Sequence, residues 1–244
     1  MRRALGAVSL LAAIGVWQAA GASAVTISYP NFASASGLTM NGAAINTGGV
    51  LRLVPGVSEE IGSAFTNRRV VSPKRSFKTR FRFSIHDGSA TPGEGMTFVL
   101  HRSGAEALGV PPGGGLGYIG IEPSLAVEFD LFENLGEGDP NGNHVAILRD
   151  GDTETHLATA TPEFDLENGT RWAWIEYSAA RKRTKIYLSD TGSKPGRPLL
   201  SFKRKLSRVL GGGKLRVGFT AASGAEYAVM DVQTWTLKQR RRRR

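Results

Sequence analysis

Hydrophobic and polar side chains alternate along several short segments of the chain. In residues 77–85, phenylalanine, threonine and isoleucine take alternate positions, and lysine or arginine takes three of the positions between them. A period of two is typical of a β-strand with one buried face and one solvated face. Shorter apolar or alternating runs predict further strands at 96–100, 125–132, 145–148, 172–177, 184–188, 215–221 and 227–237.

Turn residues separate these predicted strands. Clusters rich in glycine, proline, asparagine and aspartate include Asp87-Gly88, Asp150-Gly151 and Asn168-Gly169, and such clusters interrupt regular structure. Only residues 199–210 hint at a helical turn. Many short strands with turns between them predict an all-β fold, a jelly-roll β-sandwich. No linker divides the chain, so we expect one domain at 25–237, long enough to bury a core of its own.

The first 24 residues have the organisation of a secretory signal peptide. Arg2 and Arg3 precede an apolar run at 4–20, and Ala-Ser-Ala at 22–24 supplies the small residues of a cleavage site. A membrane anchor is the alternative, but the run is short and no charged flank follows it. The sequence therefore predicts secretion, or export to the periplasm or cell envelope.

The formal net charge of +10 lies mainly at the two ends of the chain. Residues 238–244 carry six positive charges, and a terminal run of like charges is usually a solvated tail. Such a tail could bind an anionic surface, whereas the export signal argues against nucleic acid as its partner. The absence of cysteine excludes disulfides, thiolate metal sites and a cysteine nucleophile.

Segment 128–144 holds the candidate chemistry. Glu128 and Asp130 lie two residues apart on a predicted strand, so their side chains share a face. Two adjacent carboxylates repel each other and lose hydration unless a cation lies between them. Further donors follow, namely a backbone carbonyl, a side-chain amide oxygen, a carboxylate and an imidazole, from Phe132, Asn134, Asp139 and His144.

These donors predict two metal ions. The first set consists of oxygens, which suit Ca²⁺, and it comes from Asp130, Phe132, Asn134 and Asp139. The second set mixes oxygen with nitrogen, which suits Mn²⁺ or another divalent transition metal, and it comes from Glu128, Asp130, Asp139 and His144. The alternative is a solvated acidic strand end beside a surface turn, which leaves the full spacing unexplained.

The spacing Glu-x-Asp-x-Phe-x-Asn-x4-Asp-x4-His resembles the metal-binding segment of the legume-type (L-type) lectins, the family of concanavalin A and its bacterial and animal relatives. The chain is identified as a bacterial member of this family. The resemblance implies a concanavalin A-like jelly roll and a secreted, non-catalytic, carbohydrate-binding lectin whose partners are glycans. Other segments that resemble the family are 32–38, its opening strand, and 77–83, 93–100, 115–121, 217–225 and 232–236.

The resemblance also implies a shallow sugar site beside the metals. Asn134 would bind both calcium and a sugar hydroxyl. Phe132 would stack on the sugar ring, and the backbone N–H of Gly117 would donate a hydrogen bond. The loop that selects the sugar would carry Ala225 and Glu226.

A second loop of the implied sugar site departs from the family pattern. In the family, calcium fixes this loop, often through a cis peptide bond, which here would join Gly93 and Glu94. Glu94 stands where the family usually has aspartate. The extra methylene moves the carboxylate by about one bond length, enough to change its hydrogen bonds to a sugar. The sequence therefore predicts an altered contact at Glu94 and leaves the sugar undetermined.

Two other functions remain open at this point. Glu128 and Glu133 fit the short Glu-x-Asp-x-x-Glu pattern that resembles the catalytic strand of laminarinase-like retaining glycosidases. Strict alternation places Glu133 on the face opposite Glu128, so an enzyme would need a bulge. The second alternative is a metal-stabilised adhesion scaffold that binds no sugar. Homo-oligomers are possible, and three scattered histidines are expected on turns or strand faces rather than on metals: His86, His101 and His156.

Overall fold

The computed structural model describes residues 24–239 except Pro92 and Glu137. The predicted signal peptide and the arginines at 240–244 lie outside the described residues. Within the described part of the chain, no helix is both long enough and apolar enough to cross a membrane.

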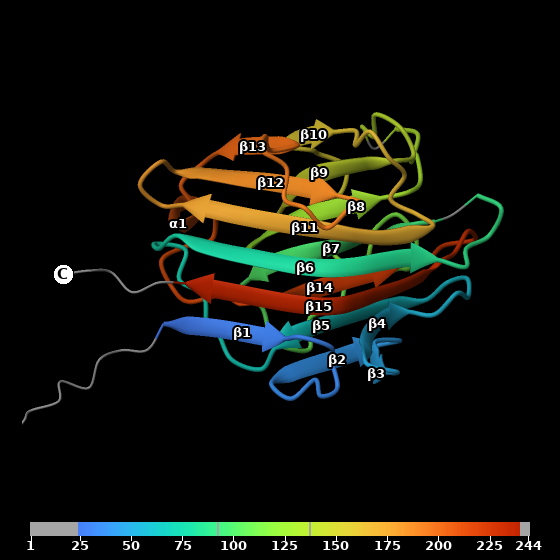
Figure 1. The fold of residues 1–244 in the computed structure, drawn as a ribbon, viewed down its shortest axis with the longest axis horizontal. Coiled ribbons are helices and arrows are strands. Elements are labelled where there is room, and N and C mark those ends of the chain that lie inside the picture. Colours follow the sequence, from blue (N-terminus) through green and yellow to red (C-terminus); the bar gives the residue numbers. More distant parts are fainter. Residues whose placement is uncertain (1–23, 92, 137, 240–244) are drawn as a thin grey trace, which may run out of the picture.

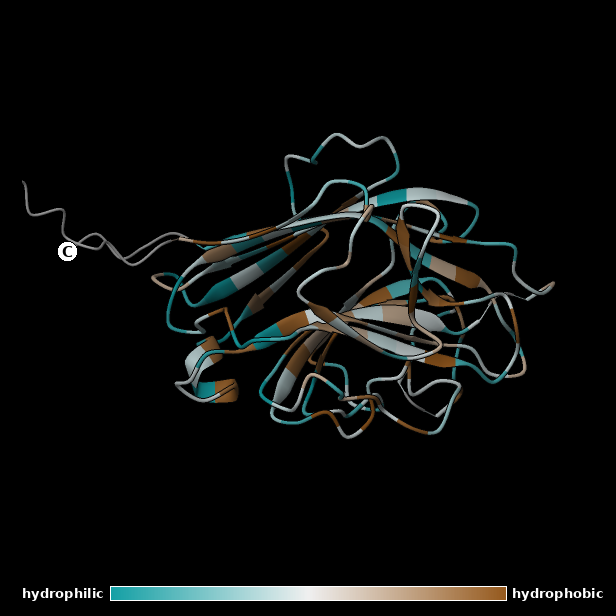
Figure 2. Cartoon of the chain, turned by 90° about the horizontal axis from the view of Figure 1, so that it is seen from below, coloured by the Kyte–Doolittle hydropathy of each residue, from teal (hydrophilic) through white to brown (hydrophobic). Residues whose placement is uncertain are grey.

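Two antiparallel sheets stack face to face (Figure 1, Figure 2). In the described residues, the larger sheet, sheet A, has the order β13-β12-β11-β6-β15-β4-β3, with β1 paired to β15. Its strands are β1 (Val25–Tyr29), β3 (Ile45–Thr47), β4 (Val50–Val54), β6 (Phe77–His86), β11 (Gly169–Ser178), β12 (Arg183–Ser189), β13 (Leu200–Lys203) and β15 (Val229–Gln239).

The second sheet, sheet B, has the order β10-β9-β8-β7-β14-β5-β2. Sequence neighbours are often far apart in these orders, as expected for a jelly roll, so the predicted all-β jelly-roll sandwich is confirmed. The strands of sheet B are β2 (Leu38–Gly42), β5 (Ile61–Thr66), β7 (Gly95–His101), β8 (Ser124–Asp130), β9 (His144–Arg149), β10 (Ala158–Ala160) and β14 (Arg216–Ala222).

Aromatic rings fill the space between the sheets. Phe81 of sheet A contacts Phe98, Phe129 and Phe219 of sheet B, with ring centroids 5.0 to 5.7 Å apart. All four side chains are buried. Aromatic rings bury large apolar areas and gain from edge-to-face geometry, so this cluster ties the two sheets together.

The central strands of sheet B are buried on both faces. Every residue of β7 and β8 is buried. A second apolar cluster, which includes Phe65, Val99 and Tyr118, covers the side that faces away from sheet A. Because side chains alternate along a strand, this outer side also receives Glu128 and Asp130, while Phe129 points into the core between the sheets.

The sequence predicted the long strands within a few residues and missed some shorter features. Residues 32–37, expected in an opening strand, form a loop between β1 and β2. Phe32 has a φ of 38° and stacks its buried ring on Tyr29 at 4.9 Å, so packing bends the backbone there. The helical hint at 199–210 holds only for α1 (Leu206–Val209), and β15 extends to Gln239, two residues past the expected domain end.

His101 is a buried histidine at the end of β7, and it should make the protein less stable in acid. Its two ring nitrogens have no hydrogen-bond partner among the described residues. Burial, with the positive charges of Arg216 and Arg69, lowers the pKa of His101 to about 3. Between that value and the unfolded value of about 6.5, only the unfolded chain binds the proton, so stability falls as the pH falls through this window.

We expect His101→Phe to lose less stability than the wild type on acidification. Between pH 7 and pH 4.5, the free energy of unfolding of the wild type should fall by about 2 kcal/mol more than that of His101→Phe. Urea unfolding of both proteins in the presence of chelator measures these losses. Other buried groups titrate equally in the two proteins, so their effects cancel. An equal loss in both proteins would show that His101 does not drive acid unfolding.

Candidate functional site

The predicted metal-binding segment spans β8, a loop and the start of β9. Glu128 and Asp130 share the outer face of β8, and Asp130 lies directly opposite His144 in the β8–β9 register. Both carboxylates are 2% exposed, and His144 is fully buried. The antiparallel pairing thus brings together residues fourteen or more positions apart in sequence.

Asp139 returns to this cluster from the loop. The His144 Nε2 atom lies 3.6 Å from Glu128 Oε2 and 3.5 Å from Asp139 Oδ1. Asp130, Asp139 and His144 also offer one ligand atom each, and these three atoms lie within 4.8 Å of one another. The structure therefore assembles the four side chains predicted for the transition-metal site.

The electrostatics of the cluster fit a cation. Burial raises the pKa of Glu128. Burial, followed by the charge of Glu128, raises the pKa of Asp130 well above its usual range. Burial lowers the pKa of His144, but its contacts with Glu128, the Asn141 carbonyl and Asp139 together raise the pKa overall. Glu128 Oε2 and His144 Nε2 have no hydrogen-bond partner among the described residues, and buried donors and acceptors normally have one. A divalent ion would satisfy them.

The oxygen-rich side of the site holds the loop after β8. Asp130 Oδ1 accepts a 2.7 Å hydrogen bond from the Phe132 N–H. Asp139 Oδ2 accepts one of the same length from the Asn134 N–H. These bonds fix the backbone of Phe132 and Asn134, the two residues expected to complete the calcium ligands.

Three further loops meet beside Asn134. The Gly93–Glu94 peptide bond is cis, as the sequence analysis expected, and the Glu94 carbonyl accepts a hydrogen bond from the Leu131 N–H at 2.9 Å. A Cβ atom on Gly224 would lie 2.5 Å from Glu94 Oε1, and one on Gly114 would lie 2.7 Å from Asn134 Nδ2. A larger residue at either position would have to displace the Glu94 or Asn134 side chain.

The structure places Gly117, which the sequence analysis expected at the sugar site, away from the Asn134 amide. Gly117 is buried against sheet B, where a Cβ would lie 2.9 Å from the Ala221 carbonyl oxygen. The residue that abuts the Asn134 amide is Gly114. The physical reason is the turn at 115–120, in which the Tyr118 N–H bonds the Gly115 carbonyl and directs Gly117 inward.

The remaining predicted sugar-site residues surround this rim. Phe132 is half-buried, Ala225 is exposed and Glu226 is half-buried. A Cβ on Gly93 would lie 2.9 Å from the Cβ of Glu226, so the loop at 224–226 packs on the cis peptide. The rim is therefore open to solvent, with Glu94 as a buried acid beneath it.

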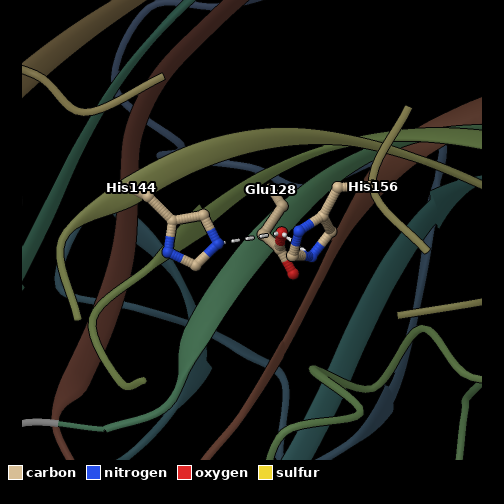
Figure 3. Close-up of side chains that lie close together, drawn as sticks. All are labelled: Glu128, His144 and His156. Carbon is tan, nitrogen blue, oxygen red and sulfur yellow. Dashed lines mark ion pairs between the residues drawn. The ribbon is translucent and has the colours of Figure 1, made fainter. Parts of the chain in front are cut away.

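His156 also lies at the metal cluster, and sequence reasoning missed it. Its Nε2 atom is 3.6 Å from Glu128 Oε2 and 3.4 Å from Asp139 Oδ1. Figure 3 shows the rings of His144 and His156 on two sides of the Glu128 carboxylate. The sequence analysis expected His156 on a turn or strand face away from the candidate ligands. The structure places it among them, because the turn after β9 brings the chain back, with the Leu157 N–H donating to the Ile147 carbonyl.

Comparisons with known proteins identify the family. The legume lectin domain matches residues 24–244. The chain belongs to the legume lectin family. A lectin from Leucomphalos mildbraedii is 33% identical over 67% of this chain and 68% of its own length. An L-type lectin-domain containing receptor kinase from Oryza sativa subsp. japonica is also 33% identical, over 74% of this chain but only 27% of its own length.

Solved legume lectins share the fold. A lectin from Bauhinia forficata in complex with GalNAc superposes with a TM-score of 0.78 at 22% identity, covering 89% of this chain and 99% of the other. Lectin I-B4 from Griffonia simplicifolia, in its metal-free form, gives a TM-score of 0.75 at 22% identity, with 89% and 100% covered. These likenesses confirm the concanavalin A-like lectin fold.

Family membership makes this chain a carbohydrate-binding lectin rather than an enzyme. The glycosidase alternative also lacks its geometry. β8 ends at Asp130, and Glu133 is exposed on the loop beyond it, while Glu128 is buried among the metal-site residues. The relatives named above are plant proteins, so the bacterial assignment is not supported by them.

Proposed function

We propose that this lectin binds glycans at the rim formed by the loops at 93–94, 113–114, 132–134 and 224–226. Asn134 and Glu94 would contact sugar hydroxyls, the Gly114 backbone would take the role expected of Gly117, and Phe132 would stack on the ring. Ala225 and Glu226 would limit which sugar fits. The close packing of Gly224 on Glu94 and of Gly114 on Asn134 supports this assignment.

Two cations would hold this rim in place. Ca²⁺ would take oxygens from Asp130, Phe132, Asn134 and Asp139, and a divalent transition metal such as Mn²⁺ would take Glu128, Asp130, Asp139 and His144. When bound, the ions would supply fixed positive charge to the buried carboxylates. The side chains of Asp130 and Asp139 anchor the loop that presents Asn134.

One observation carries the proposal. Asp139 turns Oδ1 toward His144 and Oδ2 toward the backbone N–H of Asn134. A single carboxylate therefore connects the candidate metal cluster with the candidate sugar ligand. Loss of the metals would release Asp139, and the rim would lose its fixed geometry.

A glycan array of the purified lectin, probed with Ca²⁺ and Mn²⁺ and again after chelation, tests the proposal. We expect binding to neutral sugars to fall at least about tenfold on chelation. Without the metals, the rim loops would have to become ordered at each binding event, which costs binding free energy. Binding should return when the ions are restored. Sugar binding that is unchanged by chelation would contradict the role of the metals.

The same array tests the adhesion scaffold. A groove of about 710 Å³ on the outer face of sheet A supports this second candidate, because it is lined by basic residues such as Lys78, Arg80 and Lys185 around Trp174. An anionic polymer could bind this face or the terminal arginines. No binding to neutral sugars, together with binding to anionic polymers that is lost in high salt and unaffected by chelator, would favour the scaffold. Secretion, homo-oligomers and a bacterial origin stay predictions.

A further inference from the structure

His156 is held firmly at the metal cluster although it lies on a loop. Its side chain is 5% exposed. Asp152 Oδ1 accepts hydrogen bonds from the N–H groups of Glu154 and Thr155, at 2.9 and 3.0 Å, which shapes the turn before it. A Cβ on Gly138 would lie 3.4 Å from the Glu154 carbonyl oxygen, so this turn packs against the loop that carries Asp139.

The imidazole of His156 has no partner other than the cluster. Neither ring nitrogen makes a hydrogen bond within the described residues, and both are buried. A buried polar group without a partner destabilises the folded protein. Glu128 and Asp139 lie close to the ring, with oxygens 3.6 and 3.4 Å from Nε2, but neither forms a hydrogen bond with it. An ion between these atoms and Nε2 would satisfy all of them.

We propose that His156 is a direct ligand of the transition metal and that this second imidazole makes the site select Zn²⁺ over Mn²⁺. The donor set then gains a second nitrogen, so that His144 and His156 lie beside the carboxylates of Glu128, Asp130 and Asp139. Imidazole suits zinc, whereas carboxylate-rich sets suit manganese, and Zn²⁺ binds such nitrogen donors more strongly in the general affinity order.

The spacing of the donors agrees with one shared ion. The four imidazole–carboxylate separations are 3.4, 3.5, 3.6 and 3.6 Å. Neighbouring donors of a single divalent ion at about 2.0–2.1 Å lie about 2.9–3.4 Å apart. Small movements of these side chains would therefore bring both imidazoles and both carboxylates into contact with one ion.

This inference rests on the metal half of the proposed function and is independent of sugar binding. The test is metal competition. Metal-free lectin is dialysed against equimolar Zn²⁺ and Mn²⁺ with Ca²⁺ in excess, and bound metals are counted by mass spectrometry. We expect the wild type to hold at least about ten Zn²⁺ for each Mn²⁺, and His156→Gln to lose Zn²⁺ affinity by about tenfold or more while Mn²⁺ affinity changes little.

His86→Gln is the matched control, because it removes a histidine on β6 that pairs with Asp87 and Asp231 rather than with the cluster. This variant should retain the wild-type preference. The proposal is overturned if the wild type takes up Mn²⁺ as readily as Zn²⁺, or if His156→Gln keeps the wild-type Zn²⁺ affinity. Absence of any transition metal from every variant would count against the proposed metal site as well.

Cobalt-substituted wild type provides a readout that does not depend on the folding of a variant. Co²⁺ shifts the NMR signals of ring protons on histidines that bind it. Signals from two imidazoles support His156 as a ligand, and signals from one imidazole overturn it. Neither metal experiment depends on glycan binding. If both support His156 as a ligand while the glycan array shows no sugar binding, only the proposed sugar site is refuted.

Discussion

Replacing Asp139 with alanine should abolish stoichiometric binding of both metals and reduce sugar binding below detection. Asp139 Oδ1 lies 3.5 Å from His144 Nε2 and 3.4 Å from His156 Nε2, and Oδ2 accepts the hydrogen bond from Asn134. No other carboxylate of the described residues links both histidines to the rim. The measurements are metal content by mass spectrometry and binding to an immobilised glycan that the wild type retains.

Two controls separate metal binding from loss of fold. Glu133→Gln changes an exposed acid in the same loop and should leave metals and sugar binding intact. Asp139→Asn keeps an oxygen for the Asn134 N–H but removes the charge, so it too should lose the metals. If Asp139→Asn bound sugar normally without metal, the rim would not depend on the ions.

The strands that could be predicted are those with one clearly buried face. The alternation at 77–85 matches β6 because its two faces meet different surroundings, the aromatic core and solvent. β3 and β10 have no buried residue and only three residues each, so they leave no hydrophobic period to detect. Their pairing depends on neighbours, Val50–Val54 for β3 and His144–Arg149 for β10.

Some residues of the candidate site could likewise be predicted from the sequence, and others could not. The ligands from Glu128 to His144 occupy one strand, one loop and the next strand, so their spacing in sequence reflects their spacing in space. His156 reaches the cluster only through the turn after β9, and Gly114 replaces Gly117 only because of the turn at 115–120. The hydrophobic residues of the second turn, Leu116 and Tyr118, are buried but do not indicate where the neighbouring glycines lie. A lone histidine or glycine likewise indicates nothing about what it contacts.

The aromatic core lies on the opposite side of β8 from the metal cluster. Phe129 points between the sheets, while Glu128 and Asp130 point to the outer side. β8 therefore contributes to the aromatic core with one face and carries candidate metal ligands on the other. A substitution in the core should lower stability while leaving the ligand set in place in the folded fraction.

Phe81→Ala should lower the free energy of unfolding by about 3–5 kcal/mol, the range for removal of a buried aromatic ring. Phe81 is fully buried and contacts Phe83 of its own strand as well as three rings of sheet B. Its loss leaves a cavity between the sheets that the surrounding strands cannot close, because both neighbours of β6 are hydrogen-bonded along its length.

Urea unfolding with both metals present at saturation measures this effect without a contribution from metal loss. Phe81→Leu should cost clearly less, about 1–1.5 kcal/mol, since most of the volume remains. Lys78→Ala, on the solvent face of the same strand, should change stability by about 0.5 kcal/mol or less. The folded Phe81→Ala protein should still bind metals in the wild-type ratio. A loss below about 1 kcal/mol would mean that the sheets are held together mainly by contacts outside the aromatic cluster.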